Sequence, residues 1–110
     1  MGHYLLQWSY KDSQYKAFTD KPQDREKVIE RVIRSFEGKL HGFYFSFGDY
    51  DGAAIMEFPD NESAAAFLLT VGGGGAVTKL HTTVLMTPAE AKKAMEKAHG
   101  TTSGYKPPSA

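Results

Sequence analysis

The stretch "KLHGFYFSFGDYDGAAIMEF", residues 39 to 58, contains an aromatic run and a run of small apolar residues, separated by turn-forming residues. Both runs are short and rich in residues that favour β-strands. Gly48 and Asp49 lie between them, and such a pair supplies the positive φ that a tight hairpin turn needs. We therefore predict a β-hairpin with Gly48 and Asp49 as its two loop residues.

The predicted register of this hairpin separates its side chains into two faces, because side chains alternate along a strand. One face pairs large residues with small ones, Phe43 with Ala54 and Phe45 with Gly52, a volume complementarity typical of packed core. The other face mixes apolar residues with carboxylates and hydroxyls: Leu40, Tyr44, Ser46, Asp51, Ala53, Ile55 and Glu57. That mixture suits a pocket wall or a dimer interface better than a dry core.

Further strands and helices are predicted on both sides of the hairpin. "HYLLQWSY" (3–10) is typical of a strand, and we expect a polar loop from there to residue 21. A first helix is expected to begin at Pro22 and to end at Gly38, with its apolar residues at helical spacing. A second helix follows an N-cap at Asp60 and ends in the glycines 72–75.

The remaining segment predicts a fourth strand, "AVTKLHTTVLM" (76–86), and a third helix that runs to about residue 99. Thr87 and Glu90 form a capping box at the start of this helix. The end of the chain has no apolar periodicity and is expected to be a mobile tail. We therefore expect one domain over residues 1–99 and a C-terminal tail over residues 100–110.

The order βαββαβ plus a terminal helix predicts an α+β, ferredoxin-like sandwich, with an antiparallel four-stranded sheet and two helices on one face. The other sheet face is left open. Apolar residues on an open face need a cover, and a second copy of the chain is the simplest one. We therefore expect a homodimer joined through this face.

Composition excludes several classes of function. The chain has 110 residues, with 13 basic and 13 acidic residues and no cysteine. The neutral balance gives no reason to expect nucleic acid or a membrane as a partner. Without cysteine, disulfides, thiolate nucleophiles and cysteine-ligated metal centres are excluded. Nothing at the N-terminus resembles a signal peptide, so we expect a cytoplasmic protein.

Two short motifs have the composition of known ligand sites but not their position in the fold. "HGFYFSF" (41–47) is similar to the aromatic RNP1 motif of RNA-recognition domains, but it falls on the second predicted strand, whereas RNP1 belongs on the third. The glycines 72–75 follow a helix, whereas a phosphate cradle precedes one. We expect neither RNA binding nor a bound cofactor.

The four histidines, His3, His41, His81 and His99, show no ligand spacing within one strand or helix, so no metal site is expected. The hairpin register places His41 opposite Met56. His3 and His81 lie on strands that are predicted to be neighbours. A paired role as a base or a haem ligand stays open for them, beside a role as hydrogen-bonded structural histidines.

Tyr44, Ser46, Asp51 and Glu57 form the candidate site on the hairpin. They share a predicted face, where burial would raise the pKa of a carboxylate toward that of a general base. Alternatively, Asp51 bonds turn amides, and Glu57 pairs with a basic residue across the dimer. In the first interpretation these residues bind a ligand; in the second they only stabilise the fold and the dimer.

The segment "YFSFGDYDGAAIMEFPDNESAAAFLL" (44–69) resembles the GYD-domain family, small bacterial proteins of the dimeric α/β-barrel superfamily. The residues that match its pattern are Tyr44, Gly48, Tyr50, Asp51, Glu57, Pro59 and Asp60. The resemblance implies a ferredoxin-like homodimer and no particular biochemical activity. Related barrels in the superfamily include cofactor-free monooxygenases, isomerases, cyclases and haem enzymes, so the fold alone does not determine the chemistry.

We expect a homodimeric small-molecule-binding protein, with a pocket lined by the polar sheet face and residues 3–10. Cofactor-free catalysis in that pocket is left open. The candidate ligand-binding residues are Tyr44, Ser46, Asp51, Glu57, His3 and His81. The alternative is a non-catalytic dimeric structural or accessory module that uses the sheet face only for self-association.

Overall fold

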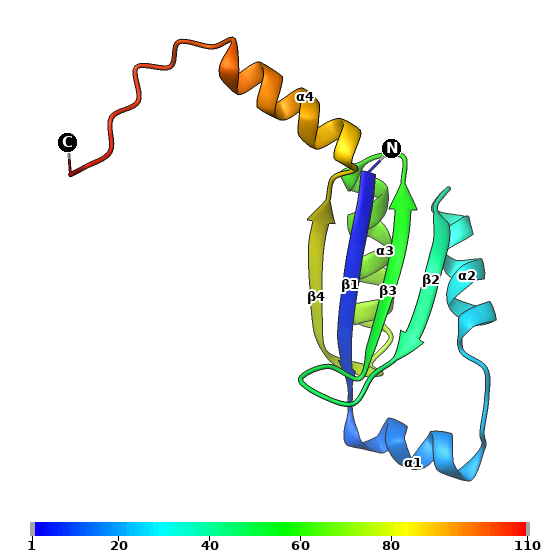
Figure 1. Ribbon diagram of the computed structural model, residues 1–110. Helices are drawn as coiled ribbons and strands as arrows, with labels where there is room; N and C mark the ends of the chain where they lie inside the picture. The colour runs from blue at the N-terminus through cyan, green and yellow to red at the C-terminus, as the bar shows by residue number, and fades with distance from the viewer. Residues whose placement is uncertain (1, 110) are drawn as a thin grey trace.

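The computed structural model describes residues 2–109 and consists of one antiparallel sheet, four helices and an extended C-terminal segment (Figure 1). The strands occur in the sheet in the order β2-β3-β1-β4. Their bounds are β1 Gly2–Tyr10, β2 Lys39–Phe45, β3 Gly52–Phe58 and β4 Val77–Leu85. This order and the helices that connect the strands confirm the predicted ferredoxin-like α+β fold.

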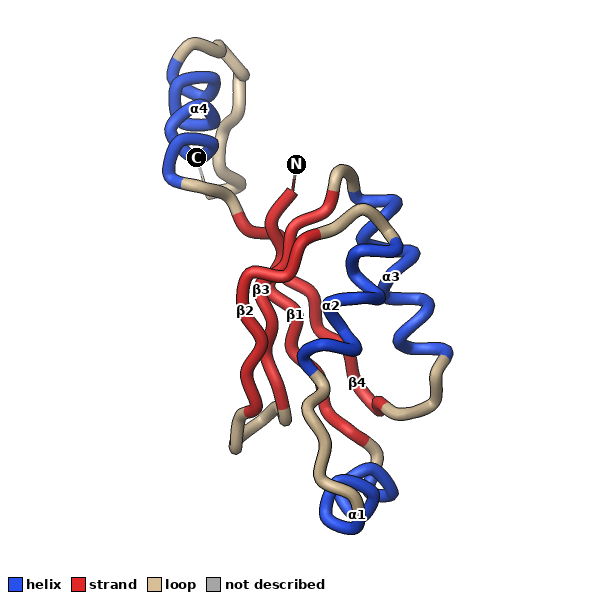
Figure 2. Tube along the Cα trace, turned by 90° about the vertical axis from the view of Figure 1, so that its right-hand side faces the viewer, coloured by secondary structure: helices blue, strands red, loops and turns tan. Residues whose placement is uncertain are grey.

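The helices are unevenly distributed around the sheet. Their bounds are α1 Asp12–Asp20, α2 Glu26–Ser35, α3 Asn61–Gly73 and α4 Pro88–His99. Figure 2 shows α2 and α3 on one face of the sheet, α1 beyond one end of it, and α4 projecting at the opposite end. The second face of the sheet is not covered by any helix of the described chain.

The core lies between the sheet and the two covering helices. Alternate residues of the central strands point into it, as the period of two requires. Its buried members are Tyr4, Leu6, Trp8, Ile33, Ala54, Met56, Phe58, Ala64 and Phe67. Phe43, which pairs with Ala54, also packs against this cluster, as predicted. Phe45 pairs with Gly52 as predicted, but it is exposed, so its predicted place in the core is wrong.

The hairpin between β2 and β3 is confirmed, but its loop is longer than predicted. The strand pairing ends at Phe45 and Gly52, and the Ser46 N–H donates to the Asp51 carbonyl at 3.0 Å. Among the described glycines only Gly75 and Gly104 have positive φ, so the positive φ predicted for Gly48 is wrong. The wider loop reverses the chain without a left-handed residue at that position.

A β-bulge in β2 changes the predicted register at the other end of the hairpin. Gly42 pairs with Ile55 and Leu40 pairs with Met56, so His41 is the extra residue. The predicted pairing of His41 with Met56 is therefore wrong. Leu40 packs against the core instead of lying on the open face, and His41 moves to the open face.

The segment that we predicted to be a polar loop contains α1. Its N-cap residue Lys11 makes no side-chain capping bond, and the helix has no buried residue, so the usual helix signals are missing. The helix is held by tertiary contacts instead. The Lys11 N–H donates to the Ala76 carbonyl at 2.9 Å, and the Phe18 ring packs edge-on against Tyr10 and Phe45.

The other three helices begin beside a side chain that accepts one of their first backbone N–H groups. α2 begins at Glu26, later than the predicted Pro22, where the Asp24 carboxylate accepts the Glu26 N–H. The predicted N-cap at Asp60 and the capping box of Thr87 with Glu90 are both confirmed.

Helix α4 and the C-terminal segment extend away from the rest of the chain (Figure 1). The radius of gyration is 18.0 Å, whereas a compact chain of this length has a value of about 13 Å. Helix α4 has no buried residue, and residues 101–109 are exposed. We propose that the domain ends at about residue 99 and that residues 100–110 are a separable tail; residue 110 lies outside the described part.

We predict that Gly52→Ala destabilises the fold and that Gly48→Ala does not. A Cβ atom at Gly52 would overlap the Trp8 ring, whereas one at Gly48 would meet no atom within 4 Å. Overpacking of this kind costs on the order of 1 to 3 kcal/mol. Urea denaturation of both variants measures the difference. Equal stabilities would contradict the close approach of Gly52 to Trp8.

We predict that a chain ending at Gly100 keeps its sheet and its melting temperature. The residues removed are exposed and contain no helix or strand from 101 to 107, so their loss exposes no core. Circular dichroism and thermal melting of the truncated chain test this. Loss of soluble, folded protein would show that the tail is part of the domain.

Candidate functional site

The open sheet face carries both apolar and polar side chains from all four strands. Its central residues are paired across the sheet, His3 with Glu57 and Leu5 with Ile55. The full set includes His3, Leu5 and Gln7 of β1, Ala53, Ile55 and Glu57 of β3, His81, Thr83 and Leu85 of β4, and His41 and Tyr44 of β2. Ile55 and Tyr44 are exposed although they are large hydrophobic residues. This face is therefore the part of the chain best suited to contact a ligand or a partner.

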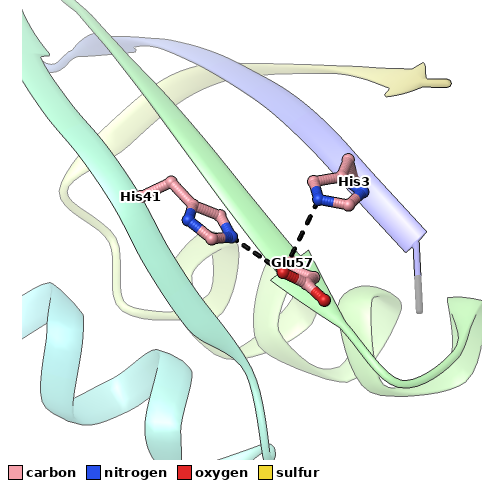
Figure 3. A group of neighbouring side chains, drawn as sticks. All are labelled: His3, His41 and Glu57. Carbon is pink, nitrogen blue, oxygen red and sulfur yellow. Dashed lines mark hydrogen bonds and ion pairs between the residues drawn. The ribbon is translucent and has the colours of Figure 1, made fainter. Parts of the chain in front are cut away.

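Three titratable side chains converge at one end of the open face: His3, His41 and Glu57 (Figure 3). Their strands are neighbours, β1 on one side of β3 and β2 on the other. His41 Nε2 lies 2.8 Å from Glu57 Oε1, and His3 Nε2 lies 3.6 Å from the same oxygen. The two imidazole rings are stacked with their centroids 5.7 Å apart.

The surroundings of this cluster favour the charged form of Glu57. The hydrogen bond with His41 lowers the pKa of Glu57 below its ordinary value, and His3 and Lys39 lower it further. Partial desolvation opposes this shift but is outweighed. The Glu57 side chain is only 16% exposed, compared with 30% for His3 and 38% for His41. Glu57 is thus an ionised carboxylate held between two accessible imidazoles.

The cluster can hold a metal ion or orient a general base. One ligand atom from each residue lies within 4.8 Å of the others, which is close enough to share an ion. A carboxylate that hydrogen-bonds one imidazole nitrogen also fixes which nitrogen of that ring is free to accept a proton. Both uses depend on side chains that come from three separate strands.

The sequence does not show that His41 joins the cluster, because of the bulge. His41 and Glu57 are 16 residues apart and meet only through strand pairing, so they have no ligand spacing within one strand or helix. Gly42 is a weak signal of the bulge, because glycine inside a strand often marks one. The sequence contains no clearer signal.

His81 is not brought together with His3, although their strands are neighbours. His3 is opposite Leu85 and His81 is opposite Gln7, which separates the two histidines by four residues, or roughly 13 Å along the sheet. The His81 ring instead contacts the Tyr50 ring, with centroids 5.9 Å apart. The hairpin loop therefore reaches over the far end of the open face.

Asp51 connects the hairpin to β1 and α1. Its carboxylate accepts the Tyr10 backbone N–H at 2.8 Å and the Tyr15 hydroxyl at 2.5 Å. The Asp51 N–H also donates to the Trp8 carbonyl at 2.7 Å. These bonds give Asp51 a structural role, and they lie at the opposite end of the sheet from Glu57.

The other two predicted site residues do not complete a cluster either. Tyr44 lies on the open face opposite Ala53 and is exposed. The Ser46 hydroxyl donates to the Tyr50 carbonyl at 2.7 Å, within the loop. Tyr44, Ser46, Asp51 and Glu57 are thus distributed along the length of the hairpin.

Two hollows lie on the other side of the sheet or at its end. A cavity of about 60 Å³ between the sheet and helices α2 and α3 is lined mostly by core residues. A cleft of about 350 Å³ lies at the end of the hairpin. Its lining is mainly aromatic: Tyr10, Tyr15, Phe18, Pro22, Gln23, Phe45, Ser46, Phe47 and Asp51. Neither hollow contains the cluster of His3, His41 and Glu57.

No helix within residues 2–109 is long and apolar enough to cross a membrane.

We predict that Asp51→Asn lowers the pKa of Tyr15 toward its ordinary value near 10. In the native chain the hydrogen bond to the Asp51 carboxylate raises the pKa of Tyr15. A raised pKa means that this interaction stabilises the fold below the unfolded-state pKa, and that the stabilisation is lost as the pH rises through the folded-state pKa. Carbon NMR of labelled tyrosines, assigned with Tyr15→Phe, measures the titration. Identical Tyr15 titrations in both proteins would contradict the bond.

Two solved structures are distantly similar to this chain, and the first of them supports the fold. A transcriptional regulator from Neisseria meningitidis, solved as a complex with L-Met, matches with a TM-score of 0.52 and 14% sequence identity. The match covers 79% of this chain, which spans about half (51%) of that protein. A NIPSNAP-like domain protein from Burkholderia xenovorans matches with a TM-score of 0.46 and 11% identity, over 78% of this chain and 84% of that one.

Comparison of the sequence with protein families gives a direct assignment. No curated protein matches the chain at a significant level. The model of the GYD domain matches residues 4–95, which include strands β2 to β4, helices α1 to α3 and most of β1 and α4. The chain therefore belongs to the GYD-domain family.

Proposed function

We propose that the protein is a homodimer that binds a small molecule between the open sheet faces of its two subunits. The observation that carries this proposal is the composition of the open face. It combines exposed apolar residues, such as Ile55 and Tyr44, with the convergent polar side chains of His3, His41 and Glu57. Exposed apolar surface of this kind is stabilised when a partner buries it. The polar groups would then line an enclosed space and could bind a ligand there.

A second copy of the chain is the proposed cover because helix α4 also lacks a packing surface. Its apolar residues Ala91, Ala94, Met95 and Ala98 have the spacing of one helix face. None of them is buried, and Met95 is among the exposed large hydrophobic residues. A helix of 12 residues is marginal in isolation, so contact with a partner subunit would stabilise it. Figure 2 shows α4 turned away from the face that α2 and α3 cover.

The open face is a better place for the ligand than the hollows of the single chain. Pockets for metabolites have volumes of roughly 300 Å³ or more, so the 60 Å³ cavity in the core is too small. The cleft at the hairpin end is large enough, but its carboxylate, Asp51, is already bonded by Tyr10 and Tyr15. The polar groups near Glu57 are more accessible, since both imidazoles are partly exposed.

The arrangement of Glu57 and His41 allows proton transfer to or from such a ligand. The carboxylate holds one imidazole nitrogen and thereby orients the ring, leaving the second nitrogen as an acceptor or donor. This chemistry needs no cofactor. The L-Met bound by the meningococcal regulator illustrates that a protein of similar fold binds an amino acid, and the low identity limits that likeness to the fold. The screen below therefore includes amino acids.

The alternative is a dimer without a ligand, in which the open face serves only for self-association. The two possibilities differ in the space between the sheets: side chains fill it in the alternative, whereas the proposal needs a cavity around His3, His41 and Glu57.

We predict a dimer of twice the 12.1 kDa chain mass, and we expect Ile55→Glu to disrupt it. Ile55 lies in the centre of the open face, and interfaces of this kind bury about 2,000 Å² or more. Leu69→Glu is the control, because Leu69 is also a large apolar residue and is more exposed than Ile55, but lies on α3. Sedimentation equilibrium at micromolar concentration measures the mass. A native monomer, or equal effects of the two variants, would contradict the proposed interface.

Ligand binding is tested in a thermal-shift screen of amino acids, hydroxy acids and aromatic metabolites, run in the presence of a chelator. Any hit is then measured with Glu57→Gln and Asp51→Asn, two near-isosteric changes that remove a charge. We expect Glu57→Gln to abolish binding without loss of the dimer, and Asp51→Asn to lower stability with binding intact. Binding lost only in Asp51→Asn would move the site to the cleft. A dimer with no hit would favour the self-association module.

A further inference from the structure

We propose that His3, His41 and Glu57 bind one divalent first-row transition metal ion per chain, with Zn²⁺ or Fe²⁺ as the best-matched ions. The three residues lie on adjacent strands at one end of the open sheet face, and their side chains point toward a common centre (Figure 3). The structure itself holds these donors in place, because β1 and β2 are both hydrogen-bonded to β3.

The distances between the donor atoms fit such an ion. Ligand atoms around a tetrahedral zinc are about 3.3 Å apart, since each is roughly 2.0 to 2.2 Å from the metal. The two separations from Glu57 Oε1, 2.8 Å to His41 Nε2 and 3.6 Å to His3 Nε2, lie on either side of that value. All three ligand atoms lie within 4.8 Å of one another, so side-chain rotation would have to bring them to bonding distance of one ion.

The chemistry of the donor set selects the class of metal. Two imidazole nitrogens and one carboxylate oxygen suit Zn²⁺, Fe²⁺, Co²⁺ or Ni²⁺, whereas Mg²⁺ and Ca²⁺ prefer oxygen ligands. Three protein ligands leave at least one coordination position open. Open positions are characteristic of metal sites that bind or activate a further molecule, whereas structural zinc sites have four protein ligands.

A second observation concerns the ring of His3. Its Nδ1 atom is buried and has no hydrogen-bond partner among the described residues. Buried polar atoms are ordinarily paired. A metal bound at Nε2 would leave Nδ1 protonated, and metal-bound histidines normally donate that proton to a nearby acceptor. The single chain thus provides no acceptor for the proton on His3 Nδ1, and a water molecule or a second subunit would have to provide it.

The competing explanation is a network without metal, in which His41 is hydrogen-bonded to Glu57 and His3 forms an ion pair with the same carboxylate. In that network a proton occupies the space between His41 and Glu57 at the observed 2.8 Å. A metal ion would replace this proton. Because all three ligands belong to one chain, the metal site does not depend on dimerisation or on the proposed small-molecule ligand, and each can fail without the other.

The test is titration of the untagged full chain with Co²⁺ and Zn²⁺. Visible absorption of bound Co²⁺ reports its coordination, and calorimetry with Zn²⁺ gives affinity and stoichiometry. We expect one ion per chain, and a loss of affinity of roughly tenfold or more in His3→Ala, His41→Ala and Glu57→Gln. His81→Ala is the matched control, because His81 is an exposed histidine on the same face but away from the cluster, and it should bind as the native chain does.

Three outcomes overturn the proposal: no saturable binding, equal loss in His81→Ala, or one ion per two chains. Circular dichroism of each variant establishes that it is folded. If an alanine variant does not fold, Glu57→Gln and His41→Gln replace it, since both retain the size of the side chain. The same titration of Ile55→Glu shows whether binding persists when the dimer interface is disrupted.

Discussion

The β-bulge at His41 is the constraint on which the candidate site depends. Without it, His41 would pair with Met56 and point into the core, and Leu40 would lie exposed on the open face. The extra residue reverses both assignments, so that the apolar side chain packs against the core and the imidazole reaches Glu57. A one-residue change of register moves side chains to the opposite face, and here the change affects only one end of β2.

The two carboxylates among the candidate site residues, Asp51 and Glu57, lie at opposite ends of the sheet. Asp51, at the loop end, is occupied by Tyr10 and Tyr15 and holds α1 against the sheet. Glu57, at the other end, contacts the two partly exposed histidines His3 and His41. One end of the sheet thus carries the bonds of Asp51 and the other carries the cluster of His3, His41 and Glu57, and the uncovered face connects them. Helix α4, which leaves the body of the chain beyond β4, extends from the end that carries the cluster (Figure 1).

Much of the fold could be predicted from the sequence because its signals are local. The alternation in the strands, the N-cap Asp60 and the capping box at Thr87 each act within a few residues. Helix α1 could not be predicted in this way, because Tyr15 and Phe18 stabilise it through contacts with distant segments. The sequence identifies Glu57 and His3 as candidates. That they lie beside His41 depends on the register of three strands, which the sequence does not reveal.

The central claim is that the bulge brings His41 onto the open face beside Glu57. Cross-strand nuclear Overhauser effects between β2 and β3 measure this register directly. The structure requires Leu40 to be opposite Met56 and Gly42 opposite Ile55, with contacts between the rings of His41 and His3. Contacts that place His41 opposite Met56, with no contact between the two imidazoles, would contradict the account.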